Sequence, residues 1–159
     1  MTPPFGVPSM VAWSLRDATM QLVCPAGNLP ALQAAVDAGA NAVYAGFRDQ
    51  TNARAFPGLN FSDDELRAGV RYAHAKGAKV YLALNTYPDS ARVRDGYSAV
   101  DKAAALGCDA IIAAEMAVLD YAARTHPGLP RHLSVQGSAT TAAARKYAFE
   151  RFGISRAVL

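Results

Sequence analysis

The sequence predicts a parallel α/β fold, and three observations lead to that class. Short apolar runs alternate with amphipathic helical segments throughout residues 20–159. The runs are rich in Val, Ile, Leu and Ala on both faces, which is typical of strands covered by helices. Four helical segments end at a glycine (Gly39, Gly77, Gly107 and Gly153), and the next strand begins one to three residues later. The repeated unit is therefore strand–helix–strand, whose helical crossover allows every strand pair to be parallel.

The first unit has clear boundaries. A strand is predicted at residues 21–24, where the chain is apolar until Pro25. Asn28 is predicted to cap the following helix, because its side-chain oxygen can accept a hydrogen bond from a free amide of the first turn. Gly39 is predicted to end that helix in a left-handed conformation, and residues 42–45 form the second predicted strand.

A long connection separates the second strand from the next helix. Residues 47–61 are FRDQTNARAFPGLNF, and connections of about this length inside a compact domain usually carry function. Ser62 and Glu65 then form the pattern of a capping box, Ser-Asp-Asp-Glu. The helix is predicted to run to about Lys76, and residues 79–84 form the third predicted strand.

The same alternation continues along the rest of the sequence. Further strands are predicted at residues 110–114, 132–135 and 154–159. The helices between them are predicted to end near residue 106, to span about 116–125, and to run from after Ser138 or Thr140 to residue 152.

Two architectures accommodate this alternation: an open doubly wound sheet and a (β/α)8 barrel. The phosphate-binding pattern GxGxxG is absent after the first strand, where the sequence is CPAGNLP, and a Walker loop is absent as well. Both absences weaken the nucleotide-binding alternative. A complete barrel needs about 250 residues, whereas this sequence has 159. The prediction is therefore a TIM-type barrel truncated to about its first six strands.

Residues 1–19 differ from the rest of the sequence. They are rich in Pro and small residues and show no helical or strand period. They also lack the basic start and long apolar middle of a secretory signal. They are either a disordered tail or the product of a start codon placed upstream of a true start at Met20. Residues 20–159 are predicted to be the N-terminal part of the barrel domain.

The composition indicates a globular protein in a reducing compartment. Hydrophobic residues make up 52% and charged residues 18%, and no apolar run approaches the roughly 20 residues of a membrane-spanning helix. Cys24 and Cys108 are far apart and form no CxxC pair, so a zinc site and a disulfide scaffold are not expected. The expected location is the cytoplasm. The net charge of +3, with no basic, aromatic-rich stripe, makes nucleic acid an unexpected partner.

Three long segments resemble a known family. They are LVCPAGNLPALQAAVDAGANAVYAG, NFSDDELRAGVRYAHAKGAKVYLALNT and RHLSVQGSATT, and they resemble the collagenase-like peptidase family U32 over residues 20–159. Within that family, the segment TNARAFPGLNF is most similar to the UbiU branch. The resemblance implies a barrel-type domain that acts with a UbiV-like partner subunit on an aromatic ubiquinone precursor, in oxygen-independent hydroxylation.

The resemblance also implies a [4Fe-4S] cluster that these residues do not hold. In the family, four cysteines that follow the sixth strand bind the cluster, and this sequence ends before them. Cys24 and Cys108 do not match those positions. The expectation is a cluster in the full-length protein, no metal ligand in this chain, and no activity of this part alone.

Side chains at the carboxyl ends of the strands are the first candidates for substrate binding, because the chemistry of a barrel takes place there. Asn28 follows the first strand and is either a helix cap or a ligand-binding amide. Asn85 ends the third strand, where its amide either binds a carbonyl or phenol oxygen or forms a turn. Glu115 ends the fourth strand, where it either faces the site or caps the next helix at the positive end of its dipole.

The fifth strand and the long connection add further candidates. Gln136 can bind both donor and acceptor groups of a substrate, or be satisfied by neighbouring backbone. Ser138 is interpreted as a helix cap rather than a nucleophile, because the Gly-x-Ser-x-Gly elbow is absent. Asn52 and Arg54 belong to the UbiU-like segment, where Arg54 can bind a carboxylate or a phosphate. No catalytic residue is assigned, and the full candidate set is Asn28, Asn52, Arg54, Asn85, Glu115, Gln136 and Ser138.

The histidines and the first cysteine are interpreted as structural. His74 is placed on the exposed side of a helix, His126 in a turn, and His132 at the start of a strand. Cys24 is interpreted as a small apolar filler.

Four functions are weighed. The first is the iron-sulfur hydroxylation subunit that the resemblance to UbiU implies. A collagenase-like hydrolase ranks lower, because the sequence shows neither a nucleophile paired with a base nor a metal site. An RNA hydroxylation factor is weakened by the small charge excess. The fourth is a non-catalytic module that binds a partner subunit.

Overall fold

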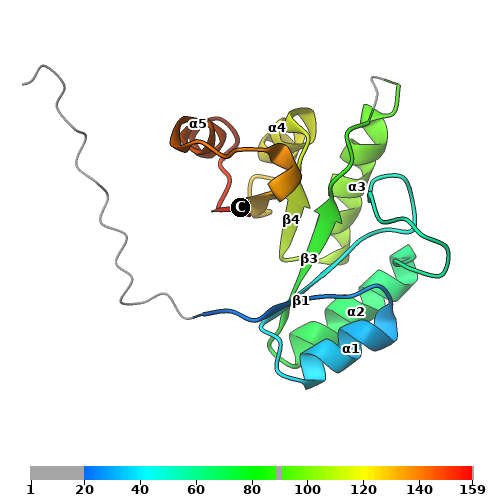
Figure 1. Ribbon diagram of the computed structural model, residues 1–159. Coiled ribbons are helices and arrows are strands. Elements are labelled where there is room, and N and C mark those ends of the chain that lie inside the picture. Colours follow the sequence, from blue (N-terminus) through cyan, green and yellow to red (C-terminus); the bar gives the residue numbers. More distant parts are fainter. Residues whose placement is uncertain (1–19, 89–90, 159) are drawn as a thin grey trace, which may run out of the picture.

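The computed structural model describes residues 20–88 and 91–158, which form a single six-stranded parallel sheet with helical connections (Figure 1). Residues 1–19, predicted to be a separate extension, lie outside the described residues. The elements in chain order are β1 (Val23–Pro25), α1 (Leu29–Asp37), β2 (Ala42–Ala45), α2 (Asp63–Ala75), β3 (Lys79–Leu84), α3 (Val93–Leu106), β4 (Ala110–Ala113), α4 (Met116–Thr125), β5 (Arg131–Leu133), the 3-10 turn η1 (Val135–Gly137), α5 (Ala142–Phe152) and β6 (Arg156–Ala157).

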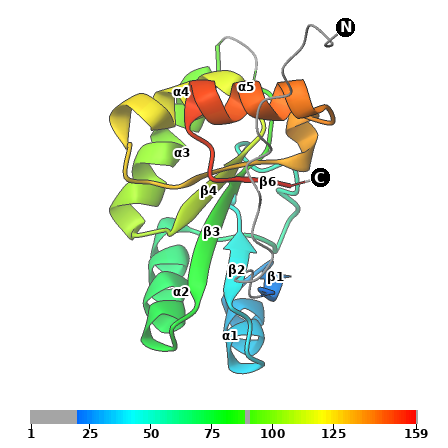
Figure 2. The same ribbon diagram turned by 90° about the vertical axis from the view of Figure 1, so that its left-hand side faces the viewer.

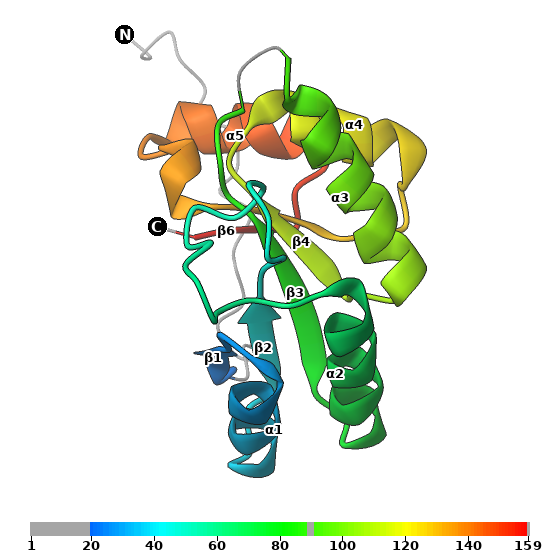
Figure 3. The same cartoon turned by 90° about the vertical axis from the view of Figure 1, so that its right-hand side faces the viewer.

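The sheet is a curled half-barrel, which confirms the predicted truncated barrel. Its strand order, β1-β2-β3-β4-β5-β6, follows the sequence, and every neighbouring pair is parallel. Figures 2 and 3 show the helices on the outer, convex side of the strands, and β6 is the last strand of the sheet, beside β5. This order is the one that successive right-handed crossovers generate in a (β/α) barrel.

The two faces of the strands are buried against different partners. Along β3, Val80, Leu82 and Leu84 belong to the large apolar core between the sheet and the helices. Tyr81 points to the other face and forms a smaller inner cluster with Ala42 and Ala110, packed against Val23, Tyr44 and Ile112. This alternation is the period of two expected of strands; the outer face packs against the helices, and the inner face lies on the concave side of the sheet.

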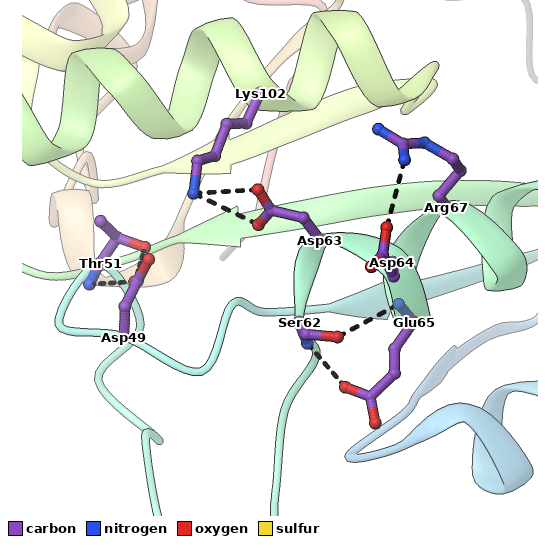
Figure 4. A network of polar contacts seen from close by, with 8 residues as sticks. All are labelled: Asp49, Thr51, Ser62, Asp63, Asp64, Glu65, Arg67 and Lys102. Carbon is purple, nitrogen blue, oxygen red and sulfur yellow. Dashed lines mark hydrogen bonds and ion pairs between the residues drawn. The ribbon is translucent and has the colours of Figure 1, made fainter.

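The helix boundaries follow from local capping. The Asn28 side chain accepts a hydrogen bond from the Ala31 amide at 2.9 Å, so the predicted cap is confirmed. Ser62 and Glu65 form the predicted capping box, drawn in Figure 4. Gly39 and Gly107 have φ angles of 93° and 80°, a left-handed conformation that residues with a Cβ rarely adopt.

Several predicted boundaries were wrong near the C-terminal end of the chain. The strand predicted to continue to residue 135 ends at Leu133, because the Ser134 hydroxyl accepts a hydrogen bond from the Gln136 amide and starts η1. Ser138 is not the cap of α5; it has a φ of 52° at the end of η1, and Thr141 caps the helix instead. The strand predicted at residues 154–159 is reduced to β6, and Leu159 lies outside the described residues.

The buried side chain of Arg131 links the ends of α4 and α5 to the sheet. Arg131 is buried in β5, and its guanidinium donates hydrogen bonds to the carbonyls of Phe152 and Leu129, both at 2.8 Å. Longer bonds reach the carbonyls of His126 and Gly153. Burial lowers the pKa of Arg131. The side chain therefore supplies donors to carbonyls near the ends of α4 and α5 that have no helical partner.

The described helices give no indication of a membrane span. Within residues 20–88 and 91–158, none is both long enough and apolar enough to cross a bilayer.

Candidate functional site

The long connection of residues 47–61 arches beyond the carboxyl end of β2 (Figure 3), and two buried amides fix its shape. Asn52 Nδ2 donates to Asn60 Oδ1 at 2.8 Å, and Asn60 Nδ2 donates to the Arg54 carbonyl at 2.7 Å. The Arg54 amide in turn donates to Asn52 Oδ1 at 3.0 Å. The chain passes closely over Gly46, where an added Cβ would lie 2.0 Å from Asn52 Nδ2. Both polar atoms of the predicted candidate Asn52 are therefore used within the loop.

Further polar contacts lie within this loop, beside it, and between it and the end of β3. Asp49 accepts hydrogen bonds from the amide and hydroxyl of Thr51 at 2.9 and 2.5 Å, and Lys102 of α3 pairs with Asp63 at 3.2 Å (Figure 4). Asn85, which directly follows β3, accepts a hydrogen bond from the Ala53 amide at 2.9 Å. The loop is thus positioned over the ends of β2 and β3.

Two cavities open at the strand ends, and they share Ala53, Asn85 and Gln136 in their walls. The inner cavity has a volume of about 450 Å³ and occupies the concave side of the half-barrel. Its wall is largely aromatic and aliphatic and includes Val23, Tyr44, Tyr81, Ala83, Ile112 and His132. A mostly apolar wall with a few polar groups is typical of small-molecule sites.

The outer cavity, of about 360 Å³, is more polar and lies between the loop and the start of α3. Its wall includes Gln50, Thr51, Arg92 and Asp95. Two contacts cross it: the Arg92 guanidinium donates to the Gln50 side chain, and the Tyr87 hydroxyl donates to the Gln136 carbonyl.

His132 is the most unusual polar residue of the inner cavity. It lies in the middle of β5, is only 6% exposed, and meets the Tyr81 ring edge-on, with ring centroids 4.8 Å apart. Burial, assisted by the positive charges of Arg156 and Lys79, lowers the pKa of His132 to about 4. The imidazole is therefore neutral at pH 7.

Arg156 of β6 reaches across the inner side of the half-barrel. Its Nη2 donates to the Gln21 side chain at 2.8 Å, just before β1, and its guanidinium carbon lies 5.9 Å from the centre of the Tyr81 ring. Arg54 lines the same cavity from the long loop. Two guanidinium groups, one from the long loop and one from β6, thus contribute to the wall.

The structure brings only part of the predicted candidate set together. Arg54, Asn85 and Gln136 line the inner cavity. Asn28 and Glu115 each accept a hydrogen bond from the first turn of a helix, α1 and α4 respectively, and neither lines a described cavity. Ser138 is exposed, and its hydroxyl contacts the Gln136 carbonyl at 3.3 Å. A role in binding stays a prediction for each of these residues.

Residues of the inner wall that sequence reasoning did not select are Tyr44, Tyr81, His132 and Arg156. Interpreting His132 as purely structural overlooked its alternation with Leu133, which belongs to the outer core. Side chains of neighbouring strand residues point to opposite faces of the sheet. Since Leu133 points outward, its neighbour His132 is predicted to point inward.

The described residues do not fit a metal or an iron-sulfur cluster. Residues 20–88 and 91–158 contain no group of three or more His, Cys, Asp or Glu side chains that could bind a metal ion. Cys24 packs against the outer core, as expected of a filler, and burial raises the pKa of the Cys108 thiol to about 12. This raised pKa makes the Cys108 thiol unsuited to ligate a metal as a thiolate.

The fold and the site define a class: a parallel (β/α) half-barrel with an apolar cavity on its concave face. The chain belongs to peptidase family U32, since residues 27–159 match the sequence profile described as "Peptidase family U32". The predicted resemblance to this family is confirmed, and the UbiU branch stays a prediction.

Curated relatives agree with this family. The chain is 36% identical over 119 residues to the tRNA hydroxylation protein P of Helicobacter pylori (strain ATCC 700392 / 26695), covering 75% of this chain and 28% of that protein. It is 33% identical over 132 residues to the Collagenase of Porphyromonas gingivalis (strain ATCC BAA-308 / W83), covering 83% and 31%. The chain thus spans under a third of the length of these relatives.

Solved structures support the same fold. "The Structure of the U32 Peptidase Mk0906" superposes with a TM-score of 0.70 at 16% identity, over 87% of this chain and 57% of that one. A glycerophosphodiester phosphodiesterase from Parabacteroides distasonis superposes with a TM-score of 0.56 at 12% identity, over 87% and 74%. At these identities the likeness concerns the fold alone.

Proposed function

We propose that the full-length protein containing this chain is an iron-sulfur subunit that supports oxygen-independent hydroxylation of an aromatic ring, as in the UbiU branch of ubiquinone biosynthesis. In this proposal, the described residues form the first part of the substrate cavity. The inner cavity carries the proposal. Its tyrosine and aliphatic walls suit a planar, apolar ring, and Asn85, His132 and Gln136 offer hydrogen bonds to ring oxygens.

The hydroxylation chemistry is supported by the relatives. Proteins named tRNA hydroxylation protein P from Helicobacter pylori and Escherichia coli share 36% and 31% identity with this chain. The proposed [4Fe-4S] cluster would supply electron transfer, and its ligands would lie in the part of the protein beyond the described residues. The described residues would bind and orient the ring and exclude water from it. A UbiV-like subunit is the proposed partner.

Hydroxylation of tRNA is the second candidate. The names of the relatives favour it, and the polar outer cavity beside Gln50, Arg92 and Asp95 offers hydrogen-bonding groups that a nucleobase needs. The net charge of only +3 and the apolar inner wall favour the quinone precursor over tRNA.

Peptide hydrolysis receives less support. In the described part of the chain, the two histidines with side-chain hydrogen bonds pair with carboxylates, His74 with Asp109 and His126 with Asp101. A serine or cysteine protease instead needs a nucleophile within hydrogen-bond reach of its base.

The test is anaerobic complementation with the full-length protein and a UbiV-like partner. In a bacterial strain that cannot hydroxylate ubiquinone precursors without oxygen, we expect mass spectrometry to detect the hydroxylated ring. A parallel strain that lacks tRNA hydroxylation protein P is scored for hydroxylated tRNA nucleosides. Restoration there alone would select the second candidate, and restoration in neither strain would overturn both.

A matched pair of variants assigns the activity to the inner cavity. Ala83→Leu places a larger side chain in the cavity wall and is expected to lower product formation at least tenfold. Ala75→Leu makes the same change on the exposed end of α2 and is expected to leave product formation unchanged.

A further inference from the structure

We propose that His132 is the hydrogen-bonding residue of the inner cavity, where its imidazole binds the hydroxyl group of an aromatic ring that packs against Tyr81. The choice of an aromatic ring rests on the proposed function. The assignment of His132 rests on the geometry of β5 and of the cavity, and it is tested below without any measurement of enzymatic activity.

The first observation is that the His132 side chain has no hydrogen-bond partner among the described residues. Its side chain is buried and lines the cavity, yet it makes no hydrogen bond within residues 20–88 and 91–158. The other two histidines behave differently: His74 Nε2 lies 2.8 Å from Asp109, and His126 Nε2 lies 2.7 Å from Asp101. The His132 ring nitrogens are not among the fully buried side-chain atoms that lack a partner, so they are reached from the cavity, where a ligand hydroxyl can bind in place of solvent.

The second observation concerns the kind of atom that His132 can bind. The low pKa that burial, Arg156 and Lys79 impose keeps the imidazole neutral at pH 7. A neutral imidazole has one donor and one acceptor nitrogen, so it pairs well with a hydroxyl group, which can also donate and accept. No carboxylate faces the ring in the inner cavity, so nothing described there stabilises the imidazolium form.

The wall around His132 indicates the chemistry of the remaining part of the ligand. Tyr81 stands edge-on to His132, while Val23, Tyr44 and Ile112 continue the apolar surface. The Arg156 guanidinium is already bound to Gln21, and it sits 5.9 Å from the Tyr81 ring. An aromatic ring placed against Tyr81 would therefore bury its faces in apolar contacts and direct its single oxygen toward His132.

The experiment compares two soluble probes that differ by one oxygen. Isothermal titration calorimetry of the full-length protein, prepared without oxygen, measures the dissociation constants of 2-allylphenol and allylbenzene at pH 7.5. One neutral hydrogen bond predicts that the wild-type protein prefers 2-allylphenol by about five- to tenfold. His132→Phe keeps a planar ring in the wall but has no polar atom, so we expect the preference to disappear while allylbenzene binding stays within twofold.

Two variants keep this test independent of folding. His132→Gln retains a donor and an acceptor and is expected to preserve part of the preference for the phenol. His74→Phe removes a histidine outside the cavity and is expected to preserve all of it. Equal binding of the two probes to the wild-type protein, binding of neither, or an unchanged preference in His132→Phe would each overturn the proposal. Phenol preference without ring hydroxylation in the complementation strain would overturn the proposed function alone.

Discussion

The outer and inner faces of the curled sheet are both buried, but they are built differently. The outer face packs aliphatic side chains such as Leu82 and Ile111 against the helices, and its buried arginine, Arg131, is hydrogen-bonded on several sides. The inner face carries Tyr81 and His132 in the wall of a cavity of about 450 Å³, and the imidazole packs against Tyr81 but makes no side-chain hydrogen bond among the described residues. The outer layer therefore consists mainly of closely packed apolar side chains, whereas the inner layer places a polar ring in the wall of a cavity, where a ligand can bind.

The largest expected effect concerns the buried arginine of the outer face. Arg131→Met keeps the apolar stem but removes the donors to the carbonyls of Phe152 and Leu129. Buried carbonyls without partners predict a loss of about 3 kcal/mol in the free energy of unfolding, measured by urea denaturation.

Arg145→Met is the matched control for this prediction. Arg145 is half-buried and donates one solvent-exposed hydrogen bond to the Thr140 carbonyl at 3.3 Å. Its replacement is expected to change the free energy of unfolding by less than about 0.5 kcal/mol. Equal losses in the two variants would contradict the idea that Arg131 fastens α4 and α5 to β5.

The next effect concerns Gly46 and the long loop that passes closely over it. In Gly46→Ala the new methyl group would meet Asn52 Nδ2, so the Asn52 side chain must shift and its hydrogen bond to Asn60 is expected to break. We expect a loss of about 2 kcal/mol in the free energy of unfolding. Gly128→Ala is the control, because an added Cβ there meets nothing within 4 Å. If Gly46→Ala lowers the free energy of unfolding no more than this control does, the loop accommodates the added methyl group without a cost in stability.

The inner face predicts a distinct pH dependence. The pKa of His132 is about 4 in the folded protein and about 6.5 in the unfolded chain, so below pH 6.5 the unfolded chain binds the additional proton. Stability should therefore be fully present above pH 6.5 and fall as the pH decreases toward 4. The slope is at most about 1.4 kcal/mol per pH unit.

His132→Phe isolates this contribution. The groups that face the imidazole, Tyr81, Lys79 and Arg156, are the same in both proteins. The carboxylates whose pKa is lowered by hydrogen bonding, Asp37 and Glu65, also occur in both and cancel in the comparison. We expect urea denaturation between pH 6.5 and 4.5 to give a shallower slope for the variant. Identical slopes would mean that His132 is protonated as easily in the folded protein as in the unfolded chain.

The sequence allowed the outer layer to be predicted much better than the inner one. The bounds of β2, β3 and α4 agree with the predicted residues, because apolar periodicity and capping are local properties of the chain. Asn85 and Gln136 were selected from the rule that barrel sites lie at strand ends.

Some inner residues were missed because the bounds of β5 and the contacts of β6 depend on tertiary structure. Placing the fifth strand one residue too late made His132 look like the start of a strand, although it occupies the centre of β5. Arg156 lies in a strand of only two residues, and its contact with Gln21 spans the whole sheet. No local pattern predicts such a contact.

The smallest expected effect concerns Asn28, for which the sequence predicted either helix capping or ligand binding. Replacing Asn28 tests which of the two roles it has. The side chain accepts the Ala31 amide and lines neither large cavity, so Asn28→Ala should cost about 1 kcal/mol of stability and leave the preference for 2-allylphenol unchanged. Asn28→Ser retains a capping hydroxyl and should recover most of the lost stability. Urea denaturation and probe titration of both variants check this. A weakened phenol preference in the well-capped serine variant would place Asn28 in the binding site after all, and would extend that site beyond the inner face of the half-barrel.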